Sequence, residues 1–302
     1  MKKYLYLLIT VTITLLLTAC GGTNEETSNE SPSDKEEAKP FTIGVIPAQT
    51  EGAIEQAMNE LQTILTEKLD REVAVEVYPD YNGVVEAMNY DKIDMAYFGP
   101  LTYVVAHEES GAKAIITQLI DGEPFYHSYI ITHKDNQWDS LEDLLAKPEE
   151  IDFAFGDPSS TSGSLIPSIE LEERGVYKSE NDYAFNSVRF TGSHDATALA
   201  VQNKQVDAGA IDSAIYNQLI ESGKIDKEQL KVIWESDKLF QYPWAVHKDT
   251  DKKTIKKLQE AFLSIEDKDI LNAFGATGFT KASNKDYEFI RKAAIKQGII
   301  EE

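Results

Sequence analysis

The segment of this chain that most clearly suggests chemistry is residues 156–168, GDPSSTSGSLIPS. It follows a short apolar run and precedes a predicted helix, and Ser159–Ser162 are four hydroxyl residues in succession. A helix start exposes backbone N–H groups that have no intrahelical acceptor, and it carries a partial positive charge. Hydroxyl groups donate hydrogen bonds as well. The segment therefore predicts a cradle for an anion that needs no lysine.

A simpler explanation is that Ser160 or Ser162 only caps the helix. One cap accounts for one hydroxyl and leaves the other three unexplained, so the anion site is favoured. Gly163 directly follows the hydroxyl run. Glycine at this position allows the backbone and a ligand to approach closely.

Other candidate residues lie where predicted strands end, which is where open α/β sheets bind ligands. His194 is either a packed side chain near a helix start or a donor to an anionic oxygen. Asp212 either caps the following helix or contacts a ligand that carries a proton or an amine. Tyr81 and Tyr126 are either core aromatics or pocket residues, since the chain has 14 tyrosines.

Strands and helices alternate along the chain, as judged by residue type and apolar spacing. The predicted strands cover residues 41–47, 73–79, 93–98, 112–120, 128–135, 151–156, 186–190, 206–212, 231–236 and 242–249. Helices are predicted between most of them. This alternation predicts an α/β protein with mainly parallel sheets and helices on their faces, arranged as two units in tandem.

The N-terminus has the pattern of a lipoprotein signal. Lys2 and Lys3 precede an apolar stretch that is too short to span a bilayer, and Cys20 is the only cysteine of the chain. We expect a signal peptide over residues 1–19, lipidation of Cys20, and a polar, flexible tether over residues 20–40. The alternative for Cys20 is an unpaired secreted thiol.

The formal net charge of the chain is −23. This charge argues against nucleic acid as a partner and against a basic face for anionic lipid. An anionic ligand must therefore be held by a local site, against the average field of the protein.

Three segments together resemble a known family. Residues 80–100, 156–168 and 193–214 closely resemble, in family order, the substrate-binding proteins of phosphonate, phosphite and phosphate ABC importers, the PhnD-like family. The similarity runs from residue 41 to at least residue 248. It implies a two-lobed periplasmic-binding-protein fold of type II, with two crossover hinge strands and a ligand in the cleft. Lobe 1 is expected to comprise residues 41–127 plus 235–302, and lobe 2 residues 128–234.

The resemblance assigns roles to individual positions. Ser160, Thr161 and Ser162 look like the cradle for the phosphonate oxygens, and His194 looks like the histidine beside it. The remaining predicted ligand-binding residues are Tyr81, Phe98, Tyr126 and Asp212.

Two departures bear on the ligand. Phe98 stands where aminoethylphosphonate binders commonly have a tyrosine hydroxyl, and the acids that hold the ligand amine in those binders look to be replaced by Ala214 and Tyr242. Asp212 lies nearby, and either replaces these acids or accepts a proton from a P–OH group. The departures favour phosphite, methylphosphonate or phosphate.

The resulting prediction is a monomeric, lipid-anchored receptor on the extracytoplasmic face of the cell membrane, on a Gram-positive surface. It hands its ligand to an ABC permease and its ATPase, catalyses nothing, uses no cofactor or metal, and touches the membrane only through the anchor.

The residues also allow two rival interpretations. Ser162, His194 and Asp212 stand in the chain order of a hydrolase triad, but the nucleophile elbow G-x-S-x-G is absent. A metal receptor is disfavoured because the five histidines are scattered along the chain. They are His107, His127, His133, His194 and His247.

Overall fold

The structure, a computed structural model, describes residues 39–49 and 53–301. The predicted signal peptide, Cys20 and all but the last two residues of the predicted tether lie outside this range. The described residues form one compact unit. No helix within the described ranges combines the length and the apolar character that a bilayer crossing requires.

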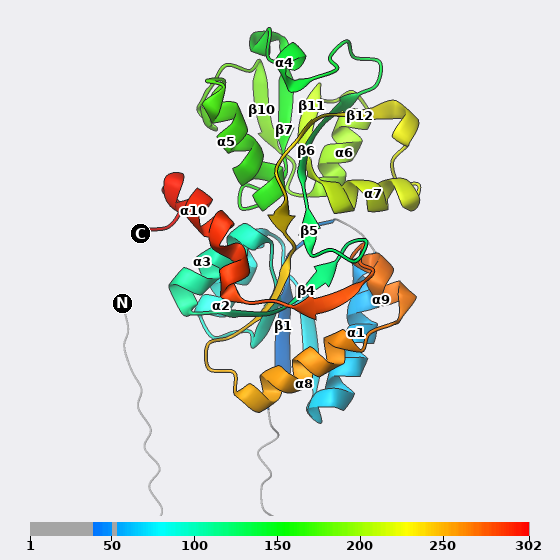
Figure 1. The fold of residues 1–302 in the computed structure, drawn as a ribbon, viewed down its shortest axis with the longest axis vertical. Helices are drawn as coiled ribbons and strands as arrows, with labels where there is room; N and C mark the ends of the chain where they lie inside the picture. The colour runs from blue at the N-terminus through cyan, green and yellow to red at the C-terminus, as the bar shows by residue number, and fades with distance from the viewer. Residues whose placement is uncertain (1–38, 50–52, 302) are drawn as a thin grey trace, which may run out of the picture. The chain divides into compact units, whose positions relative to one another are not determined.

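Two sheets make up the framework (Figure 1). Sheet I has six strands in the order β15-β4-β14-β3-β1-β2, and sheet II has five in the order β10-β7-β11-β6-β12. The strands of sheet I are β1 (Phe41–Val45), β2 (Val73–Val77), β3 (Met95–Tyr97), β4 (Lys113–Leu119), β14 (Pro243–Val246) and β15 (Gly278–Lys281). The strands of sheet II are β6 (Ser128–His133), β7 (Asp152–Phe155), β10 (Ser187–Phe190), β11 (Ala208–Asp212) and β12 (Leu230–Glu235).

Helices cover both sheets. Helices α1, α8 and α9 pack together beside sheet I, and α2, α3 and α10 form a second group. Helices α6 and α7 pack together beside sheet II, and α5 contacts β6. Their bounds are α1 (Ala53–Leu69), α2 (Tyr81–Asn89), α3 (Pro100–Ser110), α4 (Leu141–Leu144), α5 (Ile166–Glu173), α6 (His194–Gln202), α7 (Ser213–Glu221), α8 (Lys252–Leu263), α9 (Lys268–Ala273) and α10 (Glu288–Lys296).

The expectation of mainly parallel sheets is wrong. Strand β1 pairs parallel with β2 and β3, but β14 and β15 pair antiparallel with their neighbours in sheet I. In sheet II, β6 pairs antiparallel with both β11 and β12. Strands β6 and β14 each enter after the chain crosses from the other sheet. Strands β6 and β14 begin at the edge of the sheet where the strands of the β-α-β units end. They are therefore antiparallel to those strands.

The two crossings lie side by side. In the first, β5 (Phe125–Tyr126) leads directly into β6; in the second, β12 leads through β13 (Leu239–Phe240) to β14. Strands β5 and β13 pair antiparallel, and the rings of Phe125 and Phe240 meet edge to face at 5.6 Å. The chain thus joins the two sheets through one hydrogen-bonded pair of strands, as expected for hinge strands.

The crossings place the carboxyl ends of the β-α-β strands of both sheets toward each other. Several helices begin at these ends behind a capping side chain: Asp80 before α2, Ser193 before α6 and Asp212 before α7. Each cap supplies an acceptor to a backbone N–H group that the helix leaves unpaired. The edge where the sheets meet is therefore rich in helix N-termini and polar side chains.

Candidate functional site

The hydroxyl segment forms an irregular helix start. Residues Thr161–Leu165 make a π-helical turn that continues into α5. The Ser160 Oγ accepts a hydrogen bond of 3.0 Å from the Gly163 N–H. Ser160 is therefore a helix cap, which is the simpler of the two roles considered for it from the sequence. π-helical turns often mark functional sites. The cap leaves the N–H groups of the first helical residues available to a ligand.

Thr161 joins the two halves of the protein. Its Oγ1 accepts a hydrogen bond of 2.8 Å from the backbone N–H of Leu101, near the start of α3. A second bond across the same boundary runs from the N–H of His194 to the carbonyl of Ala48, at 3.2 Å. The predicted cradle is therefore closed on one side by the α3 start and on the other by residue 48.

Three buried hydroxyl groups at this boundary have no hydrogen-bond partner: those of Tyr81, Tyr126 and Ser162. All three residues are at most 2% exposed. They come from α2, β5 and the π-helical turn. An unpartnered buried polar group costs about 1–3 kcal/mol. A set of three therefore indicates that a partner from outside the chain belongs here.

These tyrosines are neutral donors. Burial raises the pKa of Tyr126 well above 10, while the nearby hydroxyls of Ser162 and Thr161 act in the opposite direction. Burial also raises the pKa of Tyr81, and the negative charge of Asp157 is the next largest cause. At neutral pH both phenols keep their protons and can donate them to an acceptor.

His194 is held between two partners. Its Nδ1 accepts from the backbone N–H of Asp212 at 3.3 Å, and its Nε2 lies 3.1 Å from the hydroxyl of Tyr242. Burial lowers the pKa of His194 to about 4, so the ring is neutral. With Nδ1 as acceptor, Nε2 carries the proton and donates to Tyr242. Both ring nitrogens of His194 are thus engaged within the protein, and its donation to a ligand stays a prediction.

Asp212 caps a helix with one of its two carboxylate oxygens. Oδ1 caps α7 by accepting from the N–H groups of Ala214 and Ile215, at 2.7 and 3.0 Å. Burial raises the pKa of Asp212 to about 7; those two N–H groups and the Tyr242 hydroxyl act in the opposite direction. The cap uses only one oxygen, so capping and ligand contact, posed as alternatives from the sequence, are compatible.

The hydrolase alternative fails on this geometry. The imidazole of His194 contacts the backbone of Asp212 instead of its carboxylate, and Tyr242 instead of Ser162. Neither the base–nucleophile contact nor the base–carboxylate contact of a triad is formed.

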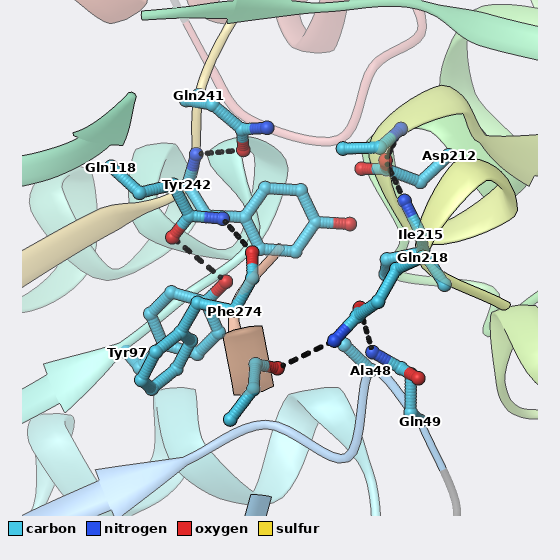
Figure 2. Close-up of a pocket in the computed structure, with 12 residues that line it drawn as sticks. Ala48, Gln49, Tyr97, Gln118, Asp212, Ile215, Gln218, Gln241, Tyr242 and Phe274 are labelled. Carbon is cyan, nitrogen blue, oxygen red and sulfur yellow. Dashed lines mark hydrogen bonds between the residues drawn. The ribbon is translucent and has the colours of Figure 1, made fainter. Parts of the chain in front are cut away.

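A small cavity adjoins the cluster (Figure 2). Its volume is about 10 Å³, which is room for one water molecule. Asp212, Ala214 and Tyr242 line it, together with Tyr97, Gln118, Gln241, Gln218, Gln49, Ala48, Ile215, Ala273 and Phe274. The two positions that the sequence comparison singled out, 214 and 242, therefore lie beside Asp212 in one cavity.

Phe98 is fully buried in the core, and its ligand role stays a prediction. Its neighbour Tyr97, which the sequence did not single out, lines the cavity and bonds Gln118 at 3.1 Å. Gln118 and Gln241 were also missed. A polar residue inside the apolar strand 112–120 was an available signal for Gln118, and the unpartnered Nε2 of Gln241 is visible only in the structure.

The site is built without a basic side chain. No lysine or arginine is among the buried residues of the described chain. One group of three acids within metal-binding distance of each other occurs among the described residues, namely Glu60, Asp267 and Asp269. None of the three lines the cavity, and two of them are exposed. Neutral donors and helix N–H groups are thus what the site offers to an anion.

Comparison with known proteins agrees with this geometry. A family model described as "ABC transporter, phosphonate, periplasmic substrate-binding protein" matches residues 43–287. The chain belongs to this family. Membership makes it a substrate-binding protein of an ABC transporter, on the extracytoplasmic side, and not an enzyme.

Three relatives illustrate the similarity. The chain is 30% identical to the phosphonates-binding periplasmic protein of Escherichia coli, covering 88% of this chain and 79% of that one. It is 31% identical to the phosphate-import protein PhnD of Mycolicibacterium smegmatis, with 83% and 78% covered. The structure of PhnD1 from Prochlorococcus marinus with methylphosphonate has a TM-score of 0.77 at 27% identity, with 87% and 99% covered. The fold is accordingly the two-lobed type II periplasmic-binding-protein fold, and each lobe is built around one of the two sheets. The residue boundaries of the lobes stay a prediction.

Gly163 is required for close packing of the cradle. A Cβ atom there would lie 2.9 Å from Ser160 Oγ and 3.2 Å from the backbone Cα of Gly156. We expect Gly163→Ala to lower the free energy of unfolding by about 1–3 kcal/mol through overpacking. Thermal unfolding measures this. Gly278→Ala is the control, since its Cβ would meet only Leu119, at 3.8 Å. Equal effects of the two substitutions would contradict the packing argument.

The stability of the ligand-free protein should depend on the protonation of Asp212. Its pKa is about 7 in the fold and 3.8 in the unfolded chain, so its contribution to stability falls as pH rises from 3.8 to 7. His194, with its pKa lowered from 6.5 to about 4, makes stability rise between pH 4 and 6.5. Asp212→Asn keeps the capping oxygen and removes the first titration. We expect its stability relative to wild type to grow between pH 4 and 7.5, by up to about 4 kcal/mol at 1.36 kcal/mol per unit.

Thermal unfolding across this pH range checks the Asp212 prediction. The matched control is Asp251→Asn, since Asp251 is an exposed cap that also accepts two N–H groups on Oδ1. Asp251 is exposed to solvent, and its pKa is lowered, mainly by the hydrogen bond from the Thr254 side chain. A pH-independent difference between wild type and Asp212→Asn would show that Asp212 does not titrate in this range.

Proposed function

We propose that this protein captures a small phosphorus oxyanion, such as phosphite, methylphosphonate or phosphate, between its two lobes and delivers it to an ABC permease for import. One observation carries the proposal: three buried hydroxyls without partners come from both lobes, with Tyr126 beside Ser162 and Thr161 and Tyr81 near Asp157. Tetrahedral oxyanions offer several acceptor oxygens in different directions, which matches donors that approach from α2, β5 and residue 162.

The donor set suits an anion in a protein of net charge −23. Ser162, Tyr81 and Tyr126 donate without carrying charge, and the N–H groups of the helix start add a fixed dipole. A lysine would attract many anions at once. Neutral donors in a buried site stabilise only a ligand whose oxygens lie at hydrogen-bonding distance from them, so they favour selectivity.

Asp212 selects for a ligand that carries a proton. Its Oδ1 is used by the α7 cap, and the other carboxylate oxygen faces Tyr242 and the cavity. A P–OH group can donate a hydrogen bond to that oxygen. Sulfate has no proton at neutral pH, so its oxygens and the Asp212 oxygen would both be acceptors. We therefore expect phosphorus oxyanions to bind and sulfate to be rejected.

The relatives support the ligand class and leave the member of the class open. One is named for phosphonates, one for phosphate import, and a third was solved with methylphosphonate. Ala214 and Tyr242 line the small cavity in place of acids, so Asp212 is the only carboxylate among the cavity-lining residues. This lining favours a small ligand without an amine.

We further propose that the mature protein is a monomer held at the outer face of a Gram-positive cell membrane by a lipid on Cys20. The sequence pattern around Cys20 supports the anchor. At the start of the described body, Arg71 donates to the carbonyls of Lys39 and Pro40, at 2.7 and 3.1 Å. These bonds tie the end of the predicted tether to the fold.

Removing an unpartnered hydroxyl should weaken ligand binding without weakening the fold. We expect Tyr81→Phe, Tyr126→Phe and Ser162→Ala each to lower the affinity for phosphite or methylphosphonate by about tenfold to hundredfold, since a hydrogen bond to a charged group contributes about 1.5–3 kcal/mol. Calorimetric titration measures the affinity, and thermal unfolding measures the stability. In the ligand-free protein the three variants should be as stable as wild type or more stable.

The control for this prediction is Tyr103→Phe. Tyr103 is also a buried tyrosine, but its hydroxyl donates to Asn284 Oδ1 at 2.7 Å and accepts from the Ala114 N–H. This variant should lose stability and keep its affinity. If wild type binds no phosphorus oxyanion, or if Tyr81→Phe and Tyr103→Phe behave alike, the proposed site is wrong.

The lipid anchor predicts a simple change of location. Cys20→Ser in a Gram-positive host should move the protein from the membrane fraction to the medium, because a lipid chain is the only attachment proposed. Fractionation with an immunoblot shows this, and incorporation of labelled fatty acid into wild type but not the variant is the companion measurement. Retention of Cys20→Ser on membranes would argue against the anchor.

A further inference from the structure

The small cavity beside Asp212 borders a larger surface groove of about 840 Å³. The cavity and the groove share three lining residues: Ala214, Gln218 and Ala273. Only Gln218 has a side chain long enough to separate the two spaces. Its α7 helix belongs to the second lobe.

Gln218 is held across the boundary between the lobes (Figure 2). Its Oε1 accepts from the side chain of Gln49 at 2.8 Å, and its Nε2 donates to the carbonyls of Asn272 and Ala273, at 3.1 Å for Ala273. Both carbonyls belong to the last turn of α9, and that of Asn272 also accepts the Gly275 N–H at 3.0 Å. The amide of Gln218 is thus anchored to the end of α9.

We propose that Gln218 is a size gate of the ligand site: it closes the cavity beside the phosphorus centre and sets the longest substituent that the protein accepts. The inference rests on the proposed function. A cavity of about 10 Å³ holds one group of the size of a water molecule, which is a hydroxyl or a methyl group. An ethyl group or a longer chain has to occupy the space of the Gln218 amide. Without that amide the chain would enter the groove.

The competing role for Gln218 is that of a latch. Its bonds to Gln49 and α9 hold the lobes together, so the loss of these bonds would lower the affinity for every ligand by the same factor. A gate makes a different prediction, because shortening the side chain changes the ratio of affinities between long and short ligands. That ratio separates the two roles.

The test is calorimetric titration of phosphite and of methyl-, ethyl-, propyl- and butylphosphonate with wild type and four variants. We expect wild type to lose at least tenfold in affinity between methyl- and propylphosphonate. In Gln218→Ala the ratio of propyl- to methylphosphonate affinity should rise at least tenfold. Gln218→Met keeps the length and loses the hydrogen bonds, so it should keep the wild-type ratio. Gln49→Met removes one bond to the gate but keeps the length of this cavity-lining side chain, so it should also keep the wild-type ratio.

The control variant is Asn217→Ala, because Asn217 lines the groove but not the cavity. It should leave all affinities unchanged. If Gln218→Ala fails to fold by circular dichroism, Gln218→Ser takes its place in the same comparison. An unchanged ratio in a folded Gln218→Ala or Gln218→Ser protein overturns the gate, as does equal binding of methyl- and butylphosphonate by wild type.

The same titrations separate this inference from the proposed function. Wild type that binds phosphite or methylphosphonate, with no change of ratio in the Gln218 variants, removes only the gate. Wild type that binds none of the five ligands removes the phosphorus site itself, and the gate with it.

Discussion

Buried hydroxyl groups need partners, and in this protein three of them meet where neither lobe provides one. Tyr81, Tyr126 and Ser162 come from three different elements, and each is closed off from solvent. The unpaired donors raise the free energy of the closed arrangement until an acceptor enters. The proposed function therefore couples ligand capture to lobe closure, because its ligand would satisfy donors that come from different lobes.

The lobes are also joined by bonds that do not involve a ligand. Thr161 receives the Leu101 N–H, His194 reaches both Ala48 and Tyr242, and Gln218 bridges to Gln49 and α9. The paired crossing strands β5 and β13 bring Tyr126 and Tyr242 to the site at the hinge itself. The same two chain crossings that reverse strands β6 and β14 therefore also supply site residues.

The electrostatics of the site follow from its dryness. His194 is neutral, the tyrosines keep their protons, and Asp212 has a pKa raised to about 7. In a buried place each group is driven toward its uncharged form. A chain with a large negative charge can then present a neutral surface to an anion, and it needs no buried lysine or arginine in the described residues to do so.

The sequence alone determined most of the alternation of helices and strands, the helix starts that carry the hydroxyl segment and Asp212, and the family. It did not predict the edge strand β15. The features that it determined depend on local patterns: apolar spacing, capping residues and motif order. Only the tertiary structure decided which hydroxyl does what. Ser160 and Ser162 are the same residue type two positions apart, yet one is satisfied by Gly163 and the other has no partner. The direction of β6 and β14, the ring of His194 turned to Tyr242, and Gln218 across the cavity depend on segments far apart in the chain. Partners of that kind have no local pattern from which a sequence could predict them.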